Sequence, residues 1–316
     1  MADEGVSAGG SARRWTRRGA EFRDLKPREY RFDPSSPADR PSIRSRQRVP
    51  DPCRYAPRGA LRHVCTVTDL TDSQLDRYAR HIILKEIGGA GQQRLLAAHV
   101  ALIGAGGIGA PAIQYLAAAG IGRLTLIDDD VVSLSNLQRQ VLFATEDVGT
   151  LKVRAAVAAV ARLNPDVRVT TRETRIGPDN AAGLLAGVDV VIDGSDNFAT
   201  RLAVADATQA LRIPLVSAAI GQFDGQLGVF RGWEDAKPCY RCLVGSDPDR
   251  PDVSCADQGV LGALTGVLGS LAAIEAIRAI VPFGADPAGT LLLIDALGFR
   301  FRTIGLPKDP GCRCAG

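Results

Sequence analysis

The 316-residue sequence has no uncharged apolar run long enough to predict a membrane span. Its longest uncharged run, residues 259–274, has 16 residues and is interrupted by four glycines and a serine, so it falls short of a membrane-spanning helix. The N-terminus also lacks the apolar core of a secretory signal. We therefore expect a cytoplasmic protein without a membrane partner. In that reducing environment, seven cysteines indicate metal or thiol chemistry rather than disulfides.

The sequence has little net charge, and its charges are unevenly distributed. Residues 1–68 contain 15 Lys and Arg against 8 Asp and Glu, whereas residues 69–316 contain 23 against 27. The second segment therefore gives no electrostatic reason to expect a nucleic-acid partner. Residues 1–68 are rich in Arg, Pro, Ser and Gly without apolar periodicity, which predicts a disordered basic arm. We expect one ordered domain over residues 69–316, beginning with a capping box at residues 71–74.

Short apolar runs and helical patterns alternate along the middle of the chain. The runs predict buried strands at residues 99–103, 123–127, 188–192 and 214–219, and the segments between them predict helices at residues 111–119, 150–163 and 197–212. Such alternation is typical of a parallel sheet with helices on both faces. Further strands at residues 226–231, 290–295 and 299–304, with a helix at 258–281, predict antiparallel additions. The expected fold class is α/β, a Rossmann-like and mostly parallel sheet extended by antiparallel strands.

A glycine-rich loop separates the first predicted strand from the following helix. Its glycines, which let the backbone approach a phosphate at a helix N-terminus, are Gly104, Gly106, Gly107 and Gly109. Asp128 and Asp130 end the next strand, where a carboxylate can reach a ribose hydroxyl. This pattern indicates a nucleotide, with an NAD-dependent oxidoreductase as the default interpretation.

The polar residues that follow favour ATP over NAD. Asn136 and Arg139 lie just past the second strand, and Lys152 opens the next helix, so cations gather where a triphosphate would lie. Asp196 and Asn197 follow the strand at 188–192, and a carboxylate at that edge is a suitable Mg²⁺ ligand beside phosphates. A dehydrogenase needs no such cluster.

These motifs resemble the ThiF/MoeB/HesA family of adenylyltransferases, relatives of the ubiquitin-activating enzymes. The matching stretches cover essentially all of residues 70–316: 77–84, 104–109, 128–130, 135–140, Lys152, 193–197, Thr200 with Arg201, 238–242, 254–262 and 308–312. The molybdopterin-synthase adenylyltransferase branch is the most similar, and the branch acting on the thiamine sulfur carrier is next. The resemblance implies that the C-terminal glycine of a ubiquitin-fold sulfur carrier attacks the α-phosphate of ATP and releases pyrophosphate.

The resemblance also implies roles for individual residues. Asp128 would hold the ribose, and Asp196 would hold Mg²⁺. Asn136, Arg139 and Lys152 would bind the phosphates. Arg80 would reach the γ-phosphate in a neighbouring subunit, which implies a homodimer; its alternative is an arginine on a helix surface.

Four of the cysteines form two close pairs, Cys239 with Cys242 and Cys312 with Cys314. The resemblance implies a structural Zn²⁺ held by both pairs. The second pair is one residue shorter than the family pattern, so an extended chain would point its side chains to opposite faces and make Cys314 the weakest ligand. Cys255 follows a polar, proline-containing stretch. In some relatives the matching thiol joins covalently to the carrier; the alternative is a small buried residue at a helix start.

Two further classes of function remain as alternatives. An NAD-dependent dehydrogenase would leave Arg139, Lys152 and Asp196 without a purpose, and a catalytically silent module that binds ubiquitin folds would not need the phosphate-site residues. Within the adenylyltransferase class, the carrier could belong to molybdenum cofactor or to thiamine biosynthesis. No sulfur-transfer domain is expected in this chain, so an external donor would supply sulfur unless Cys255 relays it.

Overall fold

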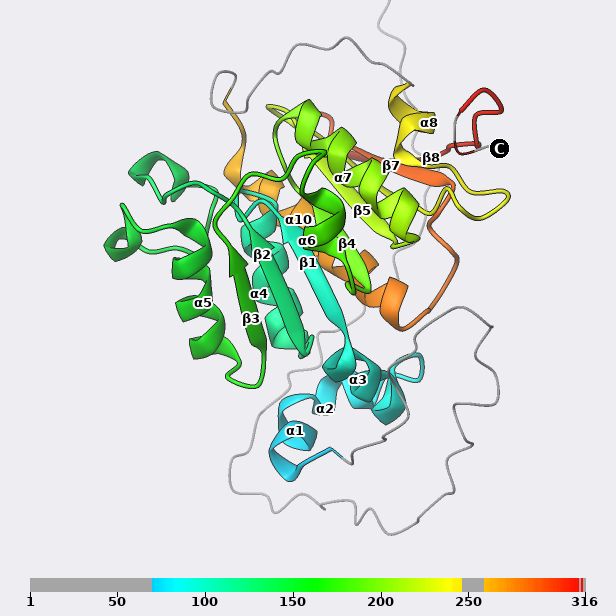
Figure 1. The fold of residues 1–316 in the computed structure, drawn as a ribbon. Coiled ribbons are helices and arrows are strands. Elements are labelled where there is room, and N and C mark those ends of the chain that lie inside the picture. The colour runs from blue at the N-terminus through cyan, green and yellow to red at the C-terminus, as the bar shows by residue number, and fades with distance from the viewer. Residues whose placement is uncertain (1–69, 246–258, 313, 315–316) are drawn as a thin grey trace, which may run out of the picture. The chain divides into compact units, whose positions relative to one another are not determined.

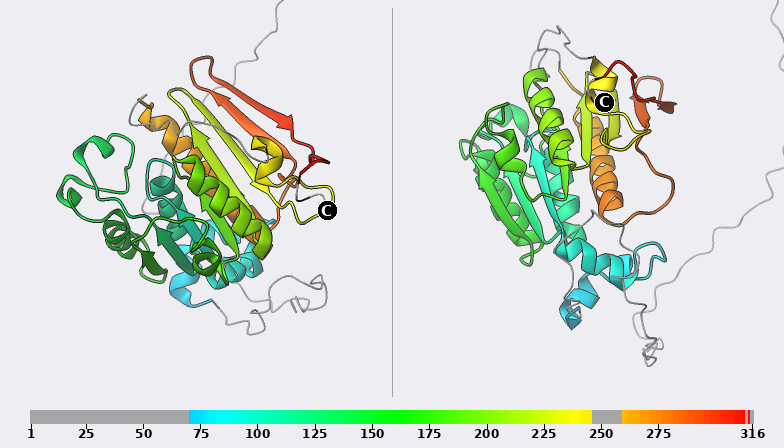
Figure 2. Two further views of the ribbon diagram at one scale, coloured as in Figure 1. Left: turned by 45° about the horizontal axis from the view of Figure 1, so that its top comes forward. Right: turned by 45° about the vertical axis from the view of Figure 1, so that its right-hand side comes forward.

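A computed structural model describes residues 70–245, 259–312 and 314 of the chain. The predicted arm at residues 1–68 lies outside the described residues, and so does Cys255. The described residues form an α/β domain built on one eight-stranded sheet in the order β3-β2-β1-β4-β5-β6-β7-β8. The ribbon views show helices lying along both faces of this sheet (Figures 1 and 2).

The sheet has a parallel half and an antiparallel half. Neighbouring strands are parallel through the series β3, β2, β1, β4 and β5. They are antiparallel through the series β5, β6, β7 and β8. The expected Rossmann-like fold with antiparallel additions is therefore confirmed. The strands are β1 (His99–Ile103), β2 (Arg123–Ile127), β3 (Arg168–Arg172), β4 (Val190–Asp193), β5 (Leu215–Ile220), β6 (Asp224–Phe230), β7 (Thr290–Asp295) and β8 (Arg300–Gly305).

Helices cover the two faces and bury the strands between two apolar cores. Helices α4 (Gly109–Ala119), α5 (Lys152–Leu163) and α10 (Gly262–Ile280) contribute to one core, and α6 (Ala181–Leu185) and α7 (Phe198–Leu211) to the other. Alternate residues of β1 enter the two cores: Val100 and Leu102 the first, Ala101 and Ile103 the second. Because both faces are covered, such a strand has an uninterrupted apolar sequence.

Three short helices precede the sheet, and one lies beside the C-terminal tail. They are α1 (Asp72–Arg77), α2 (Ala79–Ile82), α3 (Gly88–Ala97) and α8 (Tyr240–Val244). The capping box expected before the first helix is present, because the Thr71 hydroxyl accepts from the Gln74 amide and the Gln74 side chain accepts from the Thr71 amide. The sequence did not predict helices α3, α6 and α8 or strand β3.

The helix predicted over residues 150–163 begins two residues later than expected, and Thr150 is not its cap. Helix α5 begins at Lys152 with Leu151 in the N-cap position. The Thr150 carbonyl accepts from the Val132 amide, and Val131 and Leu151 form an isolated antiparallel bridge. The backbone is therefore held extended up to Leu151 and turns helical only at Lys152.

Helix α10 is long and apolar enough to cross a membrane by length and composition alone. Its Leu264, Leu268, Ala272, Ala276 and Ile280 are buried in the first core. The helix packs against α4 and against β4, β5 and β6. These contacts identify α10 as a core helix of the domain.

Candidate functional site

A cavity of about 510 Å³ lies at the carboxyl ends of β1, β2 and β4. This is the edge of an open α/β sheet at which ligands usually bind. Ten of the predicted site residues line the cavity: Gly104, Gly106, Gly107, Asp128, Asp130, Asn136, Arg139, Lys152, Asp196 and Asn197.

Two glycines shape the loop between β1 and α4. Gly104 has a φ of +85°, which a residue with a side chain rarely adopts. A Cβ on Gly109 would lie 1.9 Å from the Gly104 carbonyl oxygen, so the chain can turn into α4 only with glycine there. Gly109 does not line the cavity; it serves the turn.

Asp128 is oriented by two backbone amides at the end of β2. Its Oδ2 accepts from the Ala105 amide at 2.7 Å, and its Oδ1 accepts from the Asp130 amide at 2.8 Å. Burial raises the pKa of this carboxyl, while Lys152 and the two amides act in the opposite direction. A fixed, half-buried acceptor at this position suits a ribose hydroxyl.

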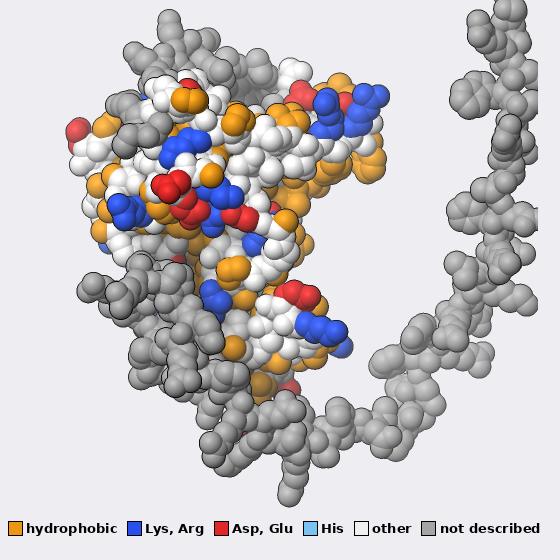
Figure 3. All heavy atoms as spheres, turned by 90° about the vertical axis from the view of Figure 1, so that its right-hand side faces the viewer, with side chains coloured by type: hydrophobic (Ala, Val, Ile, Leu, Met, Phe, Trp, Pro, Cys, Tyr) orange, Lys and Arg blue, Asp and Glu red, His pale blue; other side chains and the backbone are white. Residues whose placement is uncertain are grey.

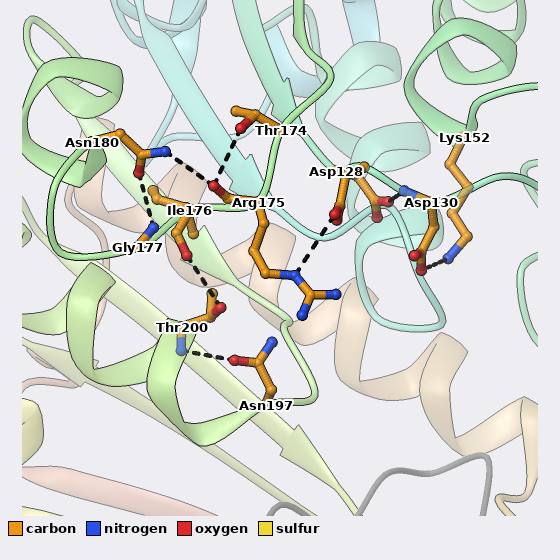
Figure 4. A network of polar contacts seen from close by, with 11 residues as sticks. Asp128, Asp130, Lys152, Thr174, Arg175, Ile176, Gly177, Asn180, Asn197 and Thr200 are labelled. Atoms are coloured by element: carbon orange, nitrogen blue, oxygen red, sulfur yellow. Dashed lines mark hydrogen bonds and ion pairs between the residues drawn. The ribbon is translucent and has the colours of Figure 1, made fainter.

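Lys152 is a buried cation in the cavity wall. Its side chain is 7% exposed, and its Nζ lies 2.7 Å from Asp130 Oδ2 (Figure 4). The Lys152 amide also donates to the Asp130 carbonyl at 2.9 Å, which ties the start of α5 to the end of β2. A preorganised ammonium of this kind is suited to phosphate oxygens.

The loop after β2 brings Asn136 and Arg139 to the same part of the cavity. Asn136 Oδ1 accepts from the Ser133 amide, and Arg139 Nη1 donates to the Ser135 carbonyl at 3.0 Å. The Thr265 hydroxyl of α10 donates to the Arg139 carbonyl at 3.2 Å. The loop is thus held by its own side chains and by the core helix.

Asp196 and Asn197 behave differently from one another in the loop after β4. Asp196 is exposed to the cavity and can offer its carboxylate to a cation. Asn197 is the N-cap of α7, and its Oδ1 accepts from the Thr200 amide at 2.8 Å. The Asn197 oxygen is therefore engaged in capping, and its side-chain NH₂ group can donate to a ligand.

Two arginines in the cavity wall were missing from the predicted site residues. Arg201 is buried, and its guanidinium donates to the Ser195 and Ala218 carbonyls and to the Ser217 hydroxyl. It therefore holds the loop that carries Asp196. Arg175 is exposed, and follows β3, a strand that the apolar pattern did not reveal. Thr200 and Arg201 formed part of a recognised motif, so Arg201 had a sequence signal and Arg175 had none.

Arg80 lies on α2, is exposed, and does not line the cavity. A contact between Arg80 and ATP would have to be made in a neighbouring subunit. Its role therefore stays a prediction.

The four paired cysteines form a cluster away from the cavity. The Sγ–Sγ distances are 3.8 Å for Cys239–Cys242, 3.5 Å for Cys239–Cys312 and 3.5 Å for Cys242–Cys314, and all four sulfurs lie within 4.8 Å of one another. Four sulfurs bound tetrahedrally to one zinc ion at about 2.3 Å would be about 3.8 Å apart. The donor set and its spacing fit Zn²⁺. Burial raises the pKa of the Cys239 thiol, so its thiolate needs a nearby cation.

The tail reaches the cluster through a turn rather than in extended form. The Asp309 carboxylate accepts from the Gly311 amide at 2.8 Å, and the Asp309 carbonyl accepts from the Cys312 amide at 3.1 Å. Lys308 Nζ also donates to the Gly232 carbonyl at 3.0 Å. The short spacing therefore does not separate Cys314 from the cluster. Figure 3 shows acidic and basic side chains next to one another on the face that it draws. Among the ion pairs of the domain, Arg231 and Lys237 both pair with Asp286.

Comparison with known proteins gives relatives that match most of the chain. The SAMP-activating enzyme E1 of Haloferax volcanii is 47% identical over 248 residues, covering 78% of this chain and 91% of the relative. The sulfur carrier protein adenylyltransferase of Thermus thermophilus is 46% identical over 250 residues, covering 78% and 92%. The molybdopterin-synthase adenylyltransferase of Salmonella typhimurium is 39% identical over 250 residues, covering 79% and 100%.

A solved structure supports the fold. The crystal structure of Escherichia coli MccB with ATP superposes with a TM-score of 0.63 at 23% identity, covering 76% of this chain and 74% of that one. The model of the ThiF family matches residues 78–314, which include the glycine loop, the cavity and the cysteine cluster. The chain therefore belongs to the ThiF family.

Proposed function

We propose that this protein uses ATP to adenylate the C-terminal glycine of a ubiquitin-fold sulfur carrier and releases pyrophosphate. The observation that carries the proposal is the cavity at the carboxyl edge of the sheet. It combines a fixed carboxylate, Asp128, with the cations Arg139 and Lys152 and with the exposed Asp196. Relatives named as adenylyltransferases, 39–46% identical to this chain, support the same activity.

The chemistry needs little more than positioning and charge stabilisation from the protein. The carrier's own carboxylate is the nucleophile and attacks the α-phosphorus, while the bond to the pyrophosphate oxygen breaks. Asp128 binds the ribose, and Asn136, Arg139 and Lys152 stabilise the charge that develops on the phosphates. Asp196 would hold Mg²⁺, which neutralises phosphate charge when bound. Arg201 keeps the Asp196 loop in place.

We assign the cysteine cluster to a structural Zn²⁺ held by Cys239, Cys242, Cys312 and Cys314. Four protein ligands leave no open position for substrate, so the ion would have no catalytic part. It would fasten the C-terminal tail to α8 and the loop after β6.

Several finer assignments belong to the same proposal. The carrier is of the molybdopterin-synthase type, with the thiamine carrier as the alternative, and an external donor supplies the sulfur. The enzyme is a cytoplasmic homodimer in which Arg80 reaches the neighbouring ATP. Cys255, which lies outside the described residues, takes no part in the chemistry in this proposal, and a covalent bond to the carrier is the alternative. An NAD-dependent oxidoreductase is disfavoured by the cations in the cavity.

Pyrophosphate exchange into ATP tests the activity, run with a molybdopterin-type and a thiamine-type carrier in parallel. Wild-type protein should exchange only with its own carrier. Arg139→Ala and Asp196→Ala should each lower the exchange rate by a factor on the order of 10²–10³, because each removes a preorganised charge contact. Arg162→Ala is the matched control, since Arg162 is an exposed cation at the far end of α5. Near-normal exchange in the Arg139 or Asp196 variant would refute these roles.

A further inference from the structure

The nucleotide cavity has two chemically different ends. Asn136, Arg139 and Lys152 lie at the end flanked by α5 and α10. The other end is lined by Asn197, by Thr200 and by residues 174–176 of the loop at 173–180. Asp128 lies between them, and in Figure 4 Arg175 and Lys152 lie on opposite sides of it. If the ribose binds Asp128 and the triphosphate extends to the cations, the nucleobase must extend toward the 173–180 loop.

The 173–180 loop is firmly anchored although it lies at the surface. Asn180 donates to the Arg175 carbonyl at 3.0 Å and accepts from the Gly177 amide at 2.8 Å. The Thr200 hydroxyl of α7 donates to the Ile176 carbonyl at 3.3 Å, and Ile176 is buried (Figure 4). The backbone that carries Arg175 is thus fixed beside an apolar side chain in the cavity wall.

The side chain of Arg175, by contrast, is weakly held. It is 68% exposed, and its Nε lies 3.7 Å from Asp129 Oδ2, whose side chain is 44% exposed. Exposed ion pairs of this kind contribute little to stability. Arg201, the other arginine on this side of the cavity, is buried and donates hydrogen bonds to Ser195, Ser217 and Ala218. Arg175 is therefore the basic group here that can move to meet a ligand.

We propose that Arg175 leaves Asp129 when ATP binds and stacks its guanidinium on the adenine, which closes the nucleobase end of the cavity against Ile176. The proposal rests on the ATP site proposed above and adds a residue that determines base affinity. A planar guanidinium stacks on an aromatic face, whereas a lysine ammonium offers only charge. The move of Arg175 from Asp129 to the adenine is favoured, because the ion pair that is lost is exposed and the contact that forms is partly shielded from water.

Equilibrium binding of ATP and of inorganic tripolyphosphate separates base contacts from phosphate contacts. Arg175→Ala should raise the Kd for ATP by about three- to thirtyfold, as expected for a lost cation–π contact, and should leave the Kd for tripolyphosphate unchanged. Arg175→Lys should recover only part of the ATP affinity. Equal losses for ATP and tripolyphosphate, or full recovery with lysine, would show that Arg175 acts through charge and would overturn the proposal.

Two further variants exclude a structural role. Arg168→Ala removes an exposed cation from the opposite end of β3 and should change neither affinity. Asp129→Asn frees Arg175 and should leave ATP affinity unchanged or higher; a loss as large as that of Arg175→Ala would mean that the ion pair itself shapes the site. Because the readout is binding, a wild-type protein that binds ATP but adenylates no carrier would contradict the proposed function alone. A wild-type protein that does not bind ATP would contradict both.

Discussion

The parallel and antiparallel halves of the sheet bury their strands to very different degrees. Every residue of β4 is buried, whereas every residue of β8 is exposed. Around the turn between β7 and β8, Leu297 is 76% and Phe299 86% exposed. Helices cover both faces of the parallel half, and this packing holds in place the carboxyl ends of the strands, where the candidate site lies. The antiparallel half depends instead on edge pairing and, in our proposal, on a zinc ion in the cysteine cluster that would fasten the tail.

Among substitutions that test this difference between the halves, Gly109→Ala in the parallel half should have the largest effect on stability. The new Cβ would meet the Gly104 carbonyl at 1.9 Å, a backbone atom that cannot swing away as a side chain could. We expect a loss of about 3 kcal/mol in the free energy of unfolding, the upper range for overpacking. Urea denaturation followed by circular dichroism measures it.

Gly183→Ala is the matched control for that substitution. A Cβ at Gly183 meets nothing within 4 Å, and the residue lies inside helix α6. Alanine should stabilise the protein there by up to about 1 kcal/mol through helix propensity. Equal effects of the two substitutions would show that the turn into α4 is not under the steric constraint described.

The next effect concerns the antiparallel half. Cys239→Ser should abolish zinc binding and lower the unfolding temperature by roughly 5–10 °C, because the tail loses its attachment to α8. ATP binding should persist, since the cavity lies at the other half of the sheet. Metal analysis and a thermal melt, with and without added zinc, measure the two quantities.

Cys314→Ser tests how far the cluster depends on its C-terminal pair, Cys312 with Cys314. Cys314 is only partly buried and belongs to the pair with the shorter spacing, so its variant should keep part of the zinc and lose less stability than Cys239→Ser. Purified wild-type protein that is free of metal and unaffected by chelator would rule the zinc site out.

The difference in strand burial also explains which strands could be predicted from the sequence. Strands β1, β2, β4 and β5 were found because burial on both faces leaves an apolar run. The edge strand β3 has the sequence RVTTR with exposed alternate residues, so its pattern resembles a loop. The end of α5 was predicted correctly, but its start was not, since Thr150 is held by backbone hydrogen bonds that no side-chain pattern encodes.

The same reasoning explains the candidate site. Asp128, Lys152 and Asp196 follow recognisable strands or open a recognisable helix, so their meeting at one edge was predictable from topology. Arg175 follows the unrecognised β3 and was missed. The approach of Cys312 to Cys239 joins positions 73 residues apart, and depends on the turn at Asp309, which the spacing of the cysteines does not reveal.

The smallest expected effect compares stability with function at a single carboxylate of the parallel half. Burial raises the pKa of Asp128 in the folded protein, so folding favours its protonated form, and the ionised form costs stability as the pH rises through that pKa. Asp128→Asn should therefore give a small stabilisation of the ligand-free protein at pH 7.5, because it removes the cost of burying the charge while its amide oxygen keeps one of the two backbone hydrogen bonds. The gain should shrink toward pH 4, where Asp128 itself is increasingly protonated.

The same variant should bind ATP more weakly, because an amide is a poorer acceptor for the ribose and is uncharged beside Lys152. Denaturation at the two pH values and an ATP titration measure both effects. A variant that is less stable at pH 7.5 would show that the amides of Ala105 and Asp130 outweigh the cost of burial.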